Sequence, residues 1–217
     1  MRLPFTDRTE AGRLLGERLA RMGLGADAVV LALPRGGVPV GYEVARALRA
    51  VLDVFVVRKL GVPGHEELAM GAIATGGVRV VNDSVTHVLG VPDHVIDRVA
   101  EEELRELERR EAAYRGRRAL PDVQGRDAIL VDDGLATGAT MRAAIQAVRV
   151  NEPARVIVAV PVAPWEACSE LRSVADEMVC LETPEPFQAV GLWYSDFTPP
   201  TDDEIRDMLA RAGGPQR

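Results

Sequence analysis

The feature that most constrains the fold is an alternation of short, almost wholly apolar runs with segments of helical periodicity. The apolar runs cover residues 28–33, 53–57, 128–131, 155–160 and 177–181. Strands that are apolar on both faces are typical of a parallel sheet buried between helices. The sequence therefore predicts an α/β fold with a doubly wound, mainly parallel sheet and helices on both faces.

The segments between these runs carry apolar side chains at helical spacing. Helices are expected at residues 7–22, 38–50, 92–115, 139–150, 164–174 and 202–210. Asp7 with Glu10, and Thr201 with Glu204, have the spacing of a capping box at a helix start. The 92–115 helix is rich in Glu and Arg, and we interpret its charges as a solvated face.

The charge balance and the cysteine content exclude several classes of protein. A net charge of -7 argues against binding of nucleic acid through a basic surface, although a local positive pocket for a phosphorylated small molecule stays possible. Cys168 and Cys180 form neither a CxxC motif nor a Cys/His cluster, so no disulfide framework or zinc site is indicated. No membrane span or signal peptide is recognisable, and a cytoplasmic protein is expected.

The stretch 129–140, ILVDDGLATGAT, places two carboxylates directly after an apolar strand. Asp132 and Asp133 carry like charges that repel each other, so the pair is costly without a partner. A cis-diol offers two donors to acceptor-only carboxylates, so this pair can hold the hydroxyls of a ribose. In the alternative interpretation the acids only cap the following helix.

The loop after the acid pair has the composition of an anion site. The backbone N–H groups from Thr137 to Thr140 and the two threonine hydroxyls would face a phosphate at a helix N-terminus. Gly134 and Gly138 permit close approach of the backbone, or in the alternative merely turn the chain. Neither a Walker loop nor a GxGxxG fingerprint is present.

These residues resemble the phosphoribosylpyrophosphate (PRPP) motif of type I phosphoribosyltransferases. The match includes the strand, both acids, Thr137, Gly138 and Thr140. The resemblance covers residues 28–181 approximately and implies one domain over 1–217. Residues 1–27 and 182–217 would then form a small hood subdomain, with a flexible loop and helical insertion at about 60–125.

The resemblance also implies a role for each loop. Asp132 and Asp133 would hold the ribose, moderate the positive charge that develops on it, and contact Mg²⁺ indirectly. The substrate phosphate and ribose would be bound by Gly134, Leu135, Ala136, Thr137, Gly138, Ala139 and Thr140.

The PRGG turn at residues 34–37 resembles the pyrophosphate loop of the family. Arg35, Gly36 and Gly37 would receive the leaving group, and an unusual, strained or cis backbone is expected at Arg35 and Gly36. A simple turn between strand and helix is the alternative.

Basic residues at the end of the second strand complete the implied site. Arg58 and Lys59 would reach the pyrophosphate, and Lys59 would join Asp132 and Asp133 as a catalytic residue. Lys59 is the only lysine among 26 basic residues, and a solvated surface lysine is the alternative. Residues 61–67 would form the flexible loop that closes over the reaction. Glu66 or Glu67 could act there as acid or base, although a solvated loop acid is the stronger alternative.

The resemblance implies an enzyme that uses Mg²⁺ and PRPP, transfers ribose 5-phosphate to a nitrogen nucleophile such as a nucleobase, and releases pyrophosphate. A homodimer is the habit of the family. Ala136 stands where 6-oxopurine enzymes have an acid, which disfavours those acceptors. Phe187, Trp193, Tyr194 and Phe197 could stack a base or pack in a core. A PRPP- or nucleotide-sensing regulatory protein and a sugar-phosphate hydrolase are the alternatives.

Overall fold

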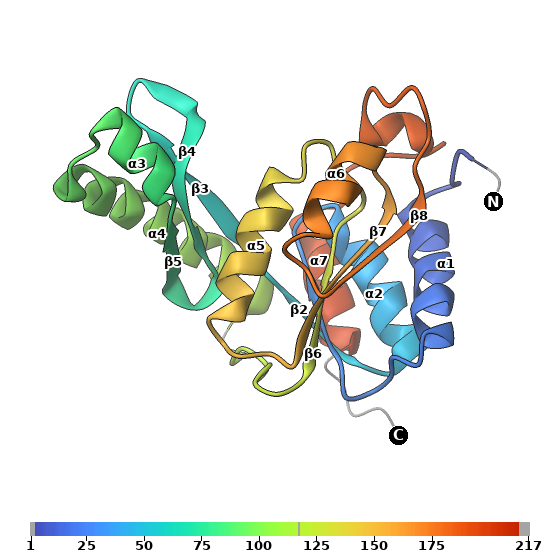
Figure 1. The fold of residues 1–217 in the computed structure, drawn as a ribbon. Helices are drawn as coiled ribbons and strands as arrows, with labels where there is room; N and C mark the ends of the chain where they lie inside the picture. Colours follow the sequence, from blue (N-terminus) through green and yellow to red (C-terminus); the bar gives the residue numbers. More distant parts are fainter. Residues whose placement is uncertain (1–2, 117, 213–217) are drawn as a thin grey trace.

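A five-stranded parallel sheet forms the centre of the computed structural model, which describes residues 3–116 and 118–212 (Figure 1). The strand order is β2-β1-β6-β7-β8. The strands are β1 (Val29–Ala32), β2 (Val51–Val54), β6 (Asp127–Val131), β7 (Arg155–Val162) and β8 (Glu177–Glu182). The predicted α/β class with a parallel sheet is confirmed.

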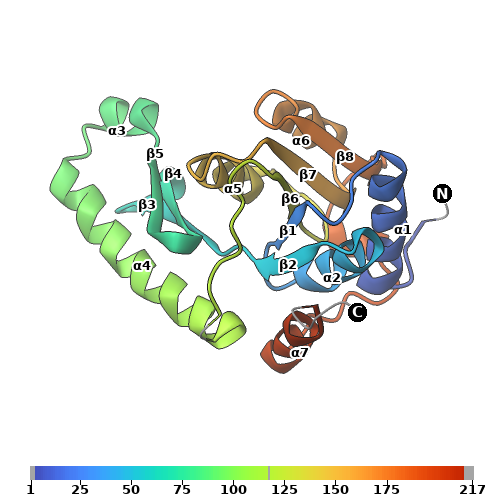
Figure 2. The ribbon, with the colours of Figure 1, turned by 90° about the horizontal axis from the view of Figure 1, so that it is seen from below.

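Both faces of this sheet are buried, because successive side chains of each strand enter different cores. Val30 and Ala32 pack with α1 (Arg8–Arg21), α2 (Gly37–Leu48) and α7 (Asp202–Ala212). Val29 and Leu31 pack with α5 (Ala139–Arg149) and α6 (Trp165–Leu171). Figure 2 shows these two groups of helices on opposite sides of the sheet. This double burial explains why the strand sequences are continuously apolar.

A separate antiparallel sheet is formed by β3 (Val57–Val62), β4 (His65–Ala74) and β5 (Val78–Val81). The expected strand over 53–57 is wrong in its extent, since β2 ends at Val54 and a new strand carries Arg58 and Lys59. The apolar run continues through two strands, and hydrophobicity alone does not mark the break between them.

The expected loop over residues 61–67 is also wrong, because most of it belongs to the β3–β4 hairpin. Only Pro63 and Gly64 lie between the strands, and Gly64 has a φ of 81°. Gly61 permits close pairing there, since a Cβ at this position would lie 3.0 Å from the carbonyl oxygen of Glu66. The strands β4 and β5 pair antiparallel and are joined through Thr75–Gly77.

Two helices follow the antiparallel sheet. The short α3 (Asp83–Leu89) was not predicted, because seven residues are too short a window to establish helical periodicity. The long α4 (Asp93–Arg115) agrees with the expected helix, and it buries a narrow stripe that includes Ile96 and Leu107. No helix in the described part of the chain is long and apolar enough to cross a membrane.

One buried ion pair joins α4 to the parallel sheet. Arg115 Nε lies 2.9 Å from Asp53 Oδ2, and Arg115 also donates to the carbonyl oxygen of Val54. Both side chains are only 6% exposed. The end of α4 is therefore fixed to β2, while the rest of the helix supports the antiparallel sheet (Figure 2).

The segment before α1 pairs with the aromatic segment near the C-terminus. The Phe5 amide donates to the carbonyl oxygen of Trp193, and the Ser195 amide donates to that of Phe5. The 3₁₀ helix η2 (Val190–Trp193) ends at the first of these contacts. Phe5 and Tyr194 are buried together, so core packing explains part of the aromatic cluster.

Both predicted capping boxes form hydrogen bonds at their helix starts. The Glu10 amide donates to Asp7 Oδ1 over 2.8 Å at α1, and the Thr201 amide donates to Glu204 Oε2 over 2.7 Å at α7. Both helices therefore begin within one residue of the expected positions.

Candidate active site

The PRGG turn and the acid pair meet at the carboxyl-terminal edge of the parallel sheet. Ala32 pairs with Val131 in register, and the Leu33 amide donates to the carbonyl oxygen of Val131 over 2.8 Å. The chain then leaves β1 into residues 34–37 and leaves β6 into residues 132–138. Parallel strands place both exits at the same edge, where ligands bind in open α/β sheets.

The two glycines of the turn allow direct contact with the acids. A Cβ on Gly36 would collide with the Asp133 carboxylate, and a Cβ on Gly37 would lie 2.9 Å from Asp132 Cα. The Pro34–Arg35 peptide bond is cis, which agrees with the unusual backbone expected there. The structure therefore brings Gly36, Gly37 and both acids into one site.

The Arg35 side chain lies away from the acid pair. Its guanidinium is 3.9 Å from Asp202 Oδ1 on α7. It lines a hollow of about 260 Å³ together with Arg109 and Arg110 of α4. The PRGG turn therefore contacts the acid pair through its backbone, and not through the Arg35 side chain.

Among the described residues, Arg8 forms an ion pair with the acids, and sequence reasoning missed it. Its Nε lies 2.7 Å from Asp133 Oδ2, and another guanidinium nitrogen donates to the carbonyl oxygen of Thr198. The guanidinium carbon lies 3.9 Å from the centre of the Phe197 ring, within cation–π range. Arg8 directly follows the cap of α1, and no local pattern distinguishes it from a surface arginine.

The backbone of Asp133 is held from two further directions. The Tyr194 hydroxyl donates to the Asp133 carbonyl oxygen over 2.5 Å, and the Asp133 amide donates to Asp132 Oδ1 over 2.8 Å. Tyr194 therefore has a structural part in the site that its sequence position does not reveal.

The two carboxylates differ in their electrostatic environment. Burial raises the pKa of Asp132 well above its ordinary value, and the charge of Asp133 raises it further. Burial also raises the pKa of Asp133, but the hydrogen bond and the charge of Arg8 oppose that shift. The charge of Asp133 is consequently compensated within the protein, while ionised Asp132 would gain most from new donors such as hydroxyl groups.

The predicted phosphate loop opens directly into α5. Gly138 precedes the helix with a φ of 72°, a conformation that glycine adopts easily. Gly134 is also constrained, because a Cβ there would lie 2.9 Å from the carbonyl oxygen of Val162. Leu135 is buried and its amide bonds to Val162, so this residue anchors the loop.

The exposed part of this loop has the composition expected for an anion site. The exposed residues are Ala136, Thr137, Ala139 and Thr140. Thr137 Oγ1 accepts a hydrogen bond from the Ala139 amide over 3.4 Å. The start of α5 therefore carries two exposed threonines at a helix N-terminus, a composition that suits a phosphate.

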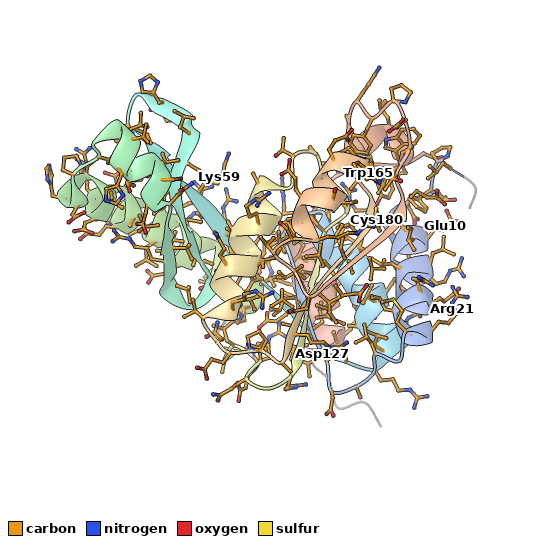
Figure 3. All side chains as sticks on the ribbon, viewed as in Figure 1. Glu10, Arg21, Lys59, Asp127, Trp165 and Cys180 are labelled. Atoms are coloured by element: carbon orange, nitrogen blue, oxygen red, sulfur yellow. The ribbon has the colours of Figure 1, made fainter. Side chains whose placement is uncertain are left out.

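Lys59 and Arg58 point in opposite directions from β3. Lys59 lines a cavity of about 310 Å³ between the antiparallel sheet and α5, and Ala139 lines the same cavity. Arg58 instead pairs with Glu103 of α4 at 2.6 Å. Successive strand residues face opposite sides, which explains the difference. Figure 3 shows Lys59 projecting from the antiparallel sheet.

The Glu66 carboxylate serves the local turn of the hairpin. It accepts a hydrogen bond from the Gly64 amide over 3.2 Å, and backbone hydrogen bonds lower its pKa. The side chain of Glu67 lies outside the described part of the structure. Glu66 is thus held in its ionised form, which favours the interpretation as a solvated turn residue.

The donor set of the site fits a magnesium ion that arrives with its substrate. No group of three or more His, Cys, Asp or Glu residues that could hold a metal occurs in the described ranges. Asp132 and Asp133 can supply at most a small share of the six oxygen ligands that Mg²⁺ prefers. One oxygen of Asp133 already accepts a hydrogen bond from Arg8. Phosphate oxygens would have to supply the others.

Comparisons with known proteins identify relatives of this chain in fold and in sequence. The chain is 45% identical to TT1426 from Thermus thermophilus, with a TM-score of 0.90, over 98% of this chain and 100% of that one. The protein AQ2163 from Aquifex aeolicus shares the fold, with a TM-score of 0.54 and 12% identity over 93% of this chain and 84% of that one.

Curated relatives occur in two strains of Mycobacterium tuberculosis, where they are provisionally named phosphoribosyl transferases MT0597 and Rv0571c. Each is 50% identical to this chain over 209 residues, which is 96% of this chain and 47% of the relative. The chain therefore spans about half the length of these relatives. The model of the phosphoribosyl transferase domain matches residues 9–195, and the chain belongs to that family.

Proposed function

We propose that the protein transfers the ribose 5-phosphate of Mg-PRPP to a nitrogen nucleophile, such as a nucleobase, and releases pyrophosphate. The contact between Gly36 and the Asp133 carboxylate carries this proposal. Because of this contact, the turn that corresponds to the family's pyrophosphate loop lies next to the acids that correspond to its ribose-binding pair. A reaction at C1 of the ribose requires that the two be adjacent. Membership of the family supports the same reaction class.

In the proposed reaction the bond between C1 and the pyrophosphate oxygen breaks, and the electron pair leaves with pyrophosphate. The nitrogen lone pair forms the new C1–N bond, and a proton on that nitrogen passes to water. The ribose becomes positively charged as the bond breaks, and nearby carboxylates stabilise such charge. Asp132 and Asp133 would provide this stabilisation and hold the diol.

The protein groups that meet the phosphates follow from the same proposal. The backbone of Gly36 and Gly37 would bind the leaving pyrophosphate, and the start of α5 would bind the 5-phosphate. The shared cavity of Lys59 and Ala139 favours Lys59 over Arg58 as the cation that reaches these groups. Bound Mg²⁺ would neutralise the leaving group, with Asp132 and Asp133 as its indirect contacts.

The proposal includes an organisation of the whole chain. Residues 28–181 would form the catalytic core, residues 1–27 and 182–217 the hood, and 60–125 the insertion. The parts of the hood at 1–2 and 213–217, and residue 117 of the insertion, lie outside the described residues. A homodimer in the cytoplasm completes the proposal, and light scattering on the purified protein would measure its mass.

The test is release of pyrophosphate from Mg-PRPP across a panel of nucleobases and other amines. We expect release that depends on one class of acceptor and that is lost in Asp133→Asn, with phosphate binding retained. Full turnover by that variant would overturn the assignment of the acid. Tight PRPP binding without release would favour a sensor, and release without any acceptor would favour a hydrolase.

A further inference from the structure

Two cysteines lie on facing surfaces between α6 and the edge strand β8. Cys168 and Cys180 are the two cysteines of the chain, and both are free thiols in the structure. Cys168 lies in the middle of α6 and is fully buried, whereas Cys180 lies on β8 and is partly exposed (Figure 3). Figure 2 shows α6 beside β7 and β8.

The side chain of Cys180 faces the α6 side of the sheet. Met178 and Cys180 pack with one hydrophobic cluster, whereas Val179, between them, belongs to the cluster on the opposite face of the sheet. Such alternation is the rule along a strand. Cys168 belongs to the same cluster as Met178. Both thiols therefore enter one layer, one from the helix and one from the strand.

The two thiols interact as a pair. A hydrogen bond with Cys180 lowers the pKa of Cys168, burial opposes this shift, and the positive charge of Arg172 supports it. The same hydrogen bond and burial raise the pKa of Cys180, which also has the carbonyl oxygen of Glu182 as an acceptor at 3.2 Å. The pair therefore gives up one proton more readily than a lone thiol and keeps the other. A thiolate is the form of cysteine that reacts with oxidants.

The helix that carries Cys168 also borders the proposed phosphate site. A Cβ on Gly138, the residue before α5, would lie 3.4 Å from Leu171 Cδ1 and 3.8 Å from Ala167 Cβ. Ala167 and Leu171 are buried residues of α6, as is Cys168. A movement of α6 would therefore be felt at the start of α5.

Formation of a disulfide would displace α6. The two sulfur atoms must approach to about 2 Å, closer than any hydrogen bond between thiols. Because β8 is held by its ladder with β7, the short α6 is the element that moves. It moves toward β8, whereas α5 packs against β6 and β7. The contacts of Ala167 and Leu171 with Gly138 would therefore loosen.

We propose that Cys168 and Cys180 form a reversible disulfide when a hydroperoxide oxidises them, and that this modification loosens the start of α5 and weakens phosphate binding there. Cytoplasmic disulfides are usually transient and redox-sensing. The effect on phosphate binding rests on the proposed function, because that function assigns the 5-phosphate to the start of α5.

The oxidation proceeds in two steps whose atoms balance. The Cys168 thiolate takes the proton of Cys180 while the exposed Cys180 sulfur attacks the hydroperoxide. The O–O bond breaks, Cys180 becomes a sulfenic acid, and the alkoxide or hydroxide leaves and is protonated by water. The Cys168 sulfur then attacks the Cys180 sulfur, the S–O bond breaks, and water leaves with the Cys168 proton. Both sulfurs are oxidised and the hydroperoxide is reduced.

Disulfide formation is tested on the full chain with equimolar hydrogen peroxide. We would count the free thiols after unfolding and identify cross-linked peptides by mass spectrometry. We expect both thiols to disappear together, one peptide pair to join Cys168 to Cys180, and dithiothreitol to restore both thiols. Unreacted thiols, disulfide-linked dimers of the chain, or oxygenated cysteines without a cross-link would overturn the proposal.

Calorimetric titration with ribose 5-phosphate tests the consequence. We expect the oxidised chain to bind it about ten-fold more weakly than the reduced chain, a loss of about 1.4 kcal/mol. Cys180→Ala is the matched control, because it keeps Cys168 and the six methionines, which peroxide also oxidises. Its affinity should be the same before and after peroxide. Equal affinity of the oxidised and reduced wild type, or an equal loss in treated Cys180→Ala, would overturn the proposal.

Hydrogen exchange separates failure of this proposal from failure of the proposed function. The amides of residues 137–140 should exchange severalfold faster in the oxidised chain than in the reduced chain, with no ligand present. If the reduced chain does not bind ribose 5-phosphate, the phosphate site of the proposed function is refuted, and the exchange rates still decide whether the disulfide loosens α5. Equal exchange rates would overturn that coupling and leave the proposed function standing.

Discussion

Arg8 Nε and Asp133 Oδ2 lie 2.7 Å apart, although 125 positions separate the two residues in the sequence. The contact joins the first helix to the acid pair, and both side chains are largely shielded from water. It resolves the repulsion between two adjacent carboxylates by giving one of them a dedicated cation. Asp132 is left as the acid whose ionisation a ligand can still stabilise.

Arg8→Ala should destabilise the protein strongly, because it leaves the Asp133 carboxylate buried without its partner. We expect the free energy of unfolding to fall by about 3 kcal/mol, as for other broken buried ion pairs. Denaturant unfolding would measure the loss. Arg13→Ala changes the same helix at a pair that is about half exposed, and it should stay within about 0.5 kcal/mol of the wild type. A similar small loss in Arg8→Ala would contradict the assigned role of Arg8.

Asp132→Asn should make the ligand-free protein more stable at neutral pH while it impairs transfer. The raised pKa of Asp132 means that its stability contribution is present below its ordinary pKa of 3.8 and is lost as pH rises through the folded pKa. The gain in the variant should approach about 1.4 kcal/mol for each unit of the shift. Urea unfolding between pH 4 and 8 would measure it. No pH-dependent difference from the wild type would show that burial does not penalise this carboxylate.

Gly36→Ala tests the contact between the PRGG turn and the acid pair. The added methyl group would collide with a carboxylate that Arg8 holds in place, so the loop or the acid must move. We expect pyrophosphate release to fall about 100-fold, the scale of a 1 Å misplacement of reacting groups. Gly25→Ala is the control, because no atom lies within 4 Å of a Cβ there. Pyrophosphate release at the wild-type rate by Gly36→Ala would show that the reaction does not need the contact between the PRGG turn and the acid pair.

Lys59→Ala should weaken binding of pyrophosphate about ten-fold without loss of stability, because Lys59 is exposed. Calorimetric titration with magnesium pyrophosphate would measure the affinity. Arg58→Ala should mainly reduce stability, since Arg58 pairs with Glu103. Arg79→Ala, on β5 of the same sheet, is the control for charge alone. Equal loss of affinity in the Lys59 and Arg79 variants would indicate that Lys59 attracts pyrophosphate only through its long-range positive charge, without a direct contact.

Arg115→Ala tests the ion pair between α4 and β2. Asp53 would remain buried without its partner, so we expect a loss of about 3 kcal/mol in the free energy of unfolding. Arg105→Ala changes an exposed arginine of the same helix and should stay within about 0.5 kcal/mol of the wild type. Thermal and denaturant unfolding would compare the two variants, and equal stability would contradict a structural role for the pair.

The periodic part of the fold could be predicted from the sequence, because double burial of the parallel sheet produces continuous apolar runs. The two loops of the site could also be recognised, because each is a short continuous stretch of sequence. One is the PRGG turn, and the other contains Asp132, Asp133 and the glycines that follow them. Arg8 and Tyr194 reach the site through tertiary contacts between segments far apart in the chain, which no local pattern encodes. The break between β2 and β3 was missed because valines run through both strands.

The ion pair at the end of α4 also has a mechanical consequence. A 23-residue helix is about 34 Å long. The C-terminal end of α4 is fixed at Asp53, beside the parallel sheet. The rest of the helix packs against β3, the strand that carries Lys59. A tilt of about 5° at the fixed end would displace the far end of a helix of that length by about 3 Å. The width of the cavity between Lys59 and the start of α5 can therefore be set by a contact on the opposite side of the antiparallel sheet.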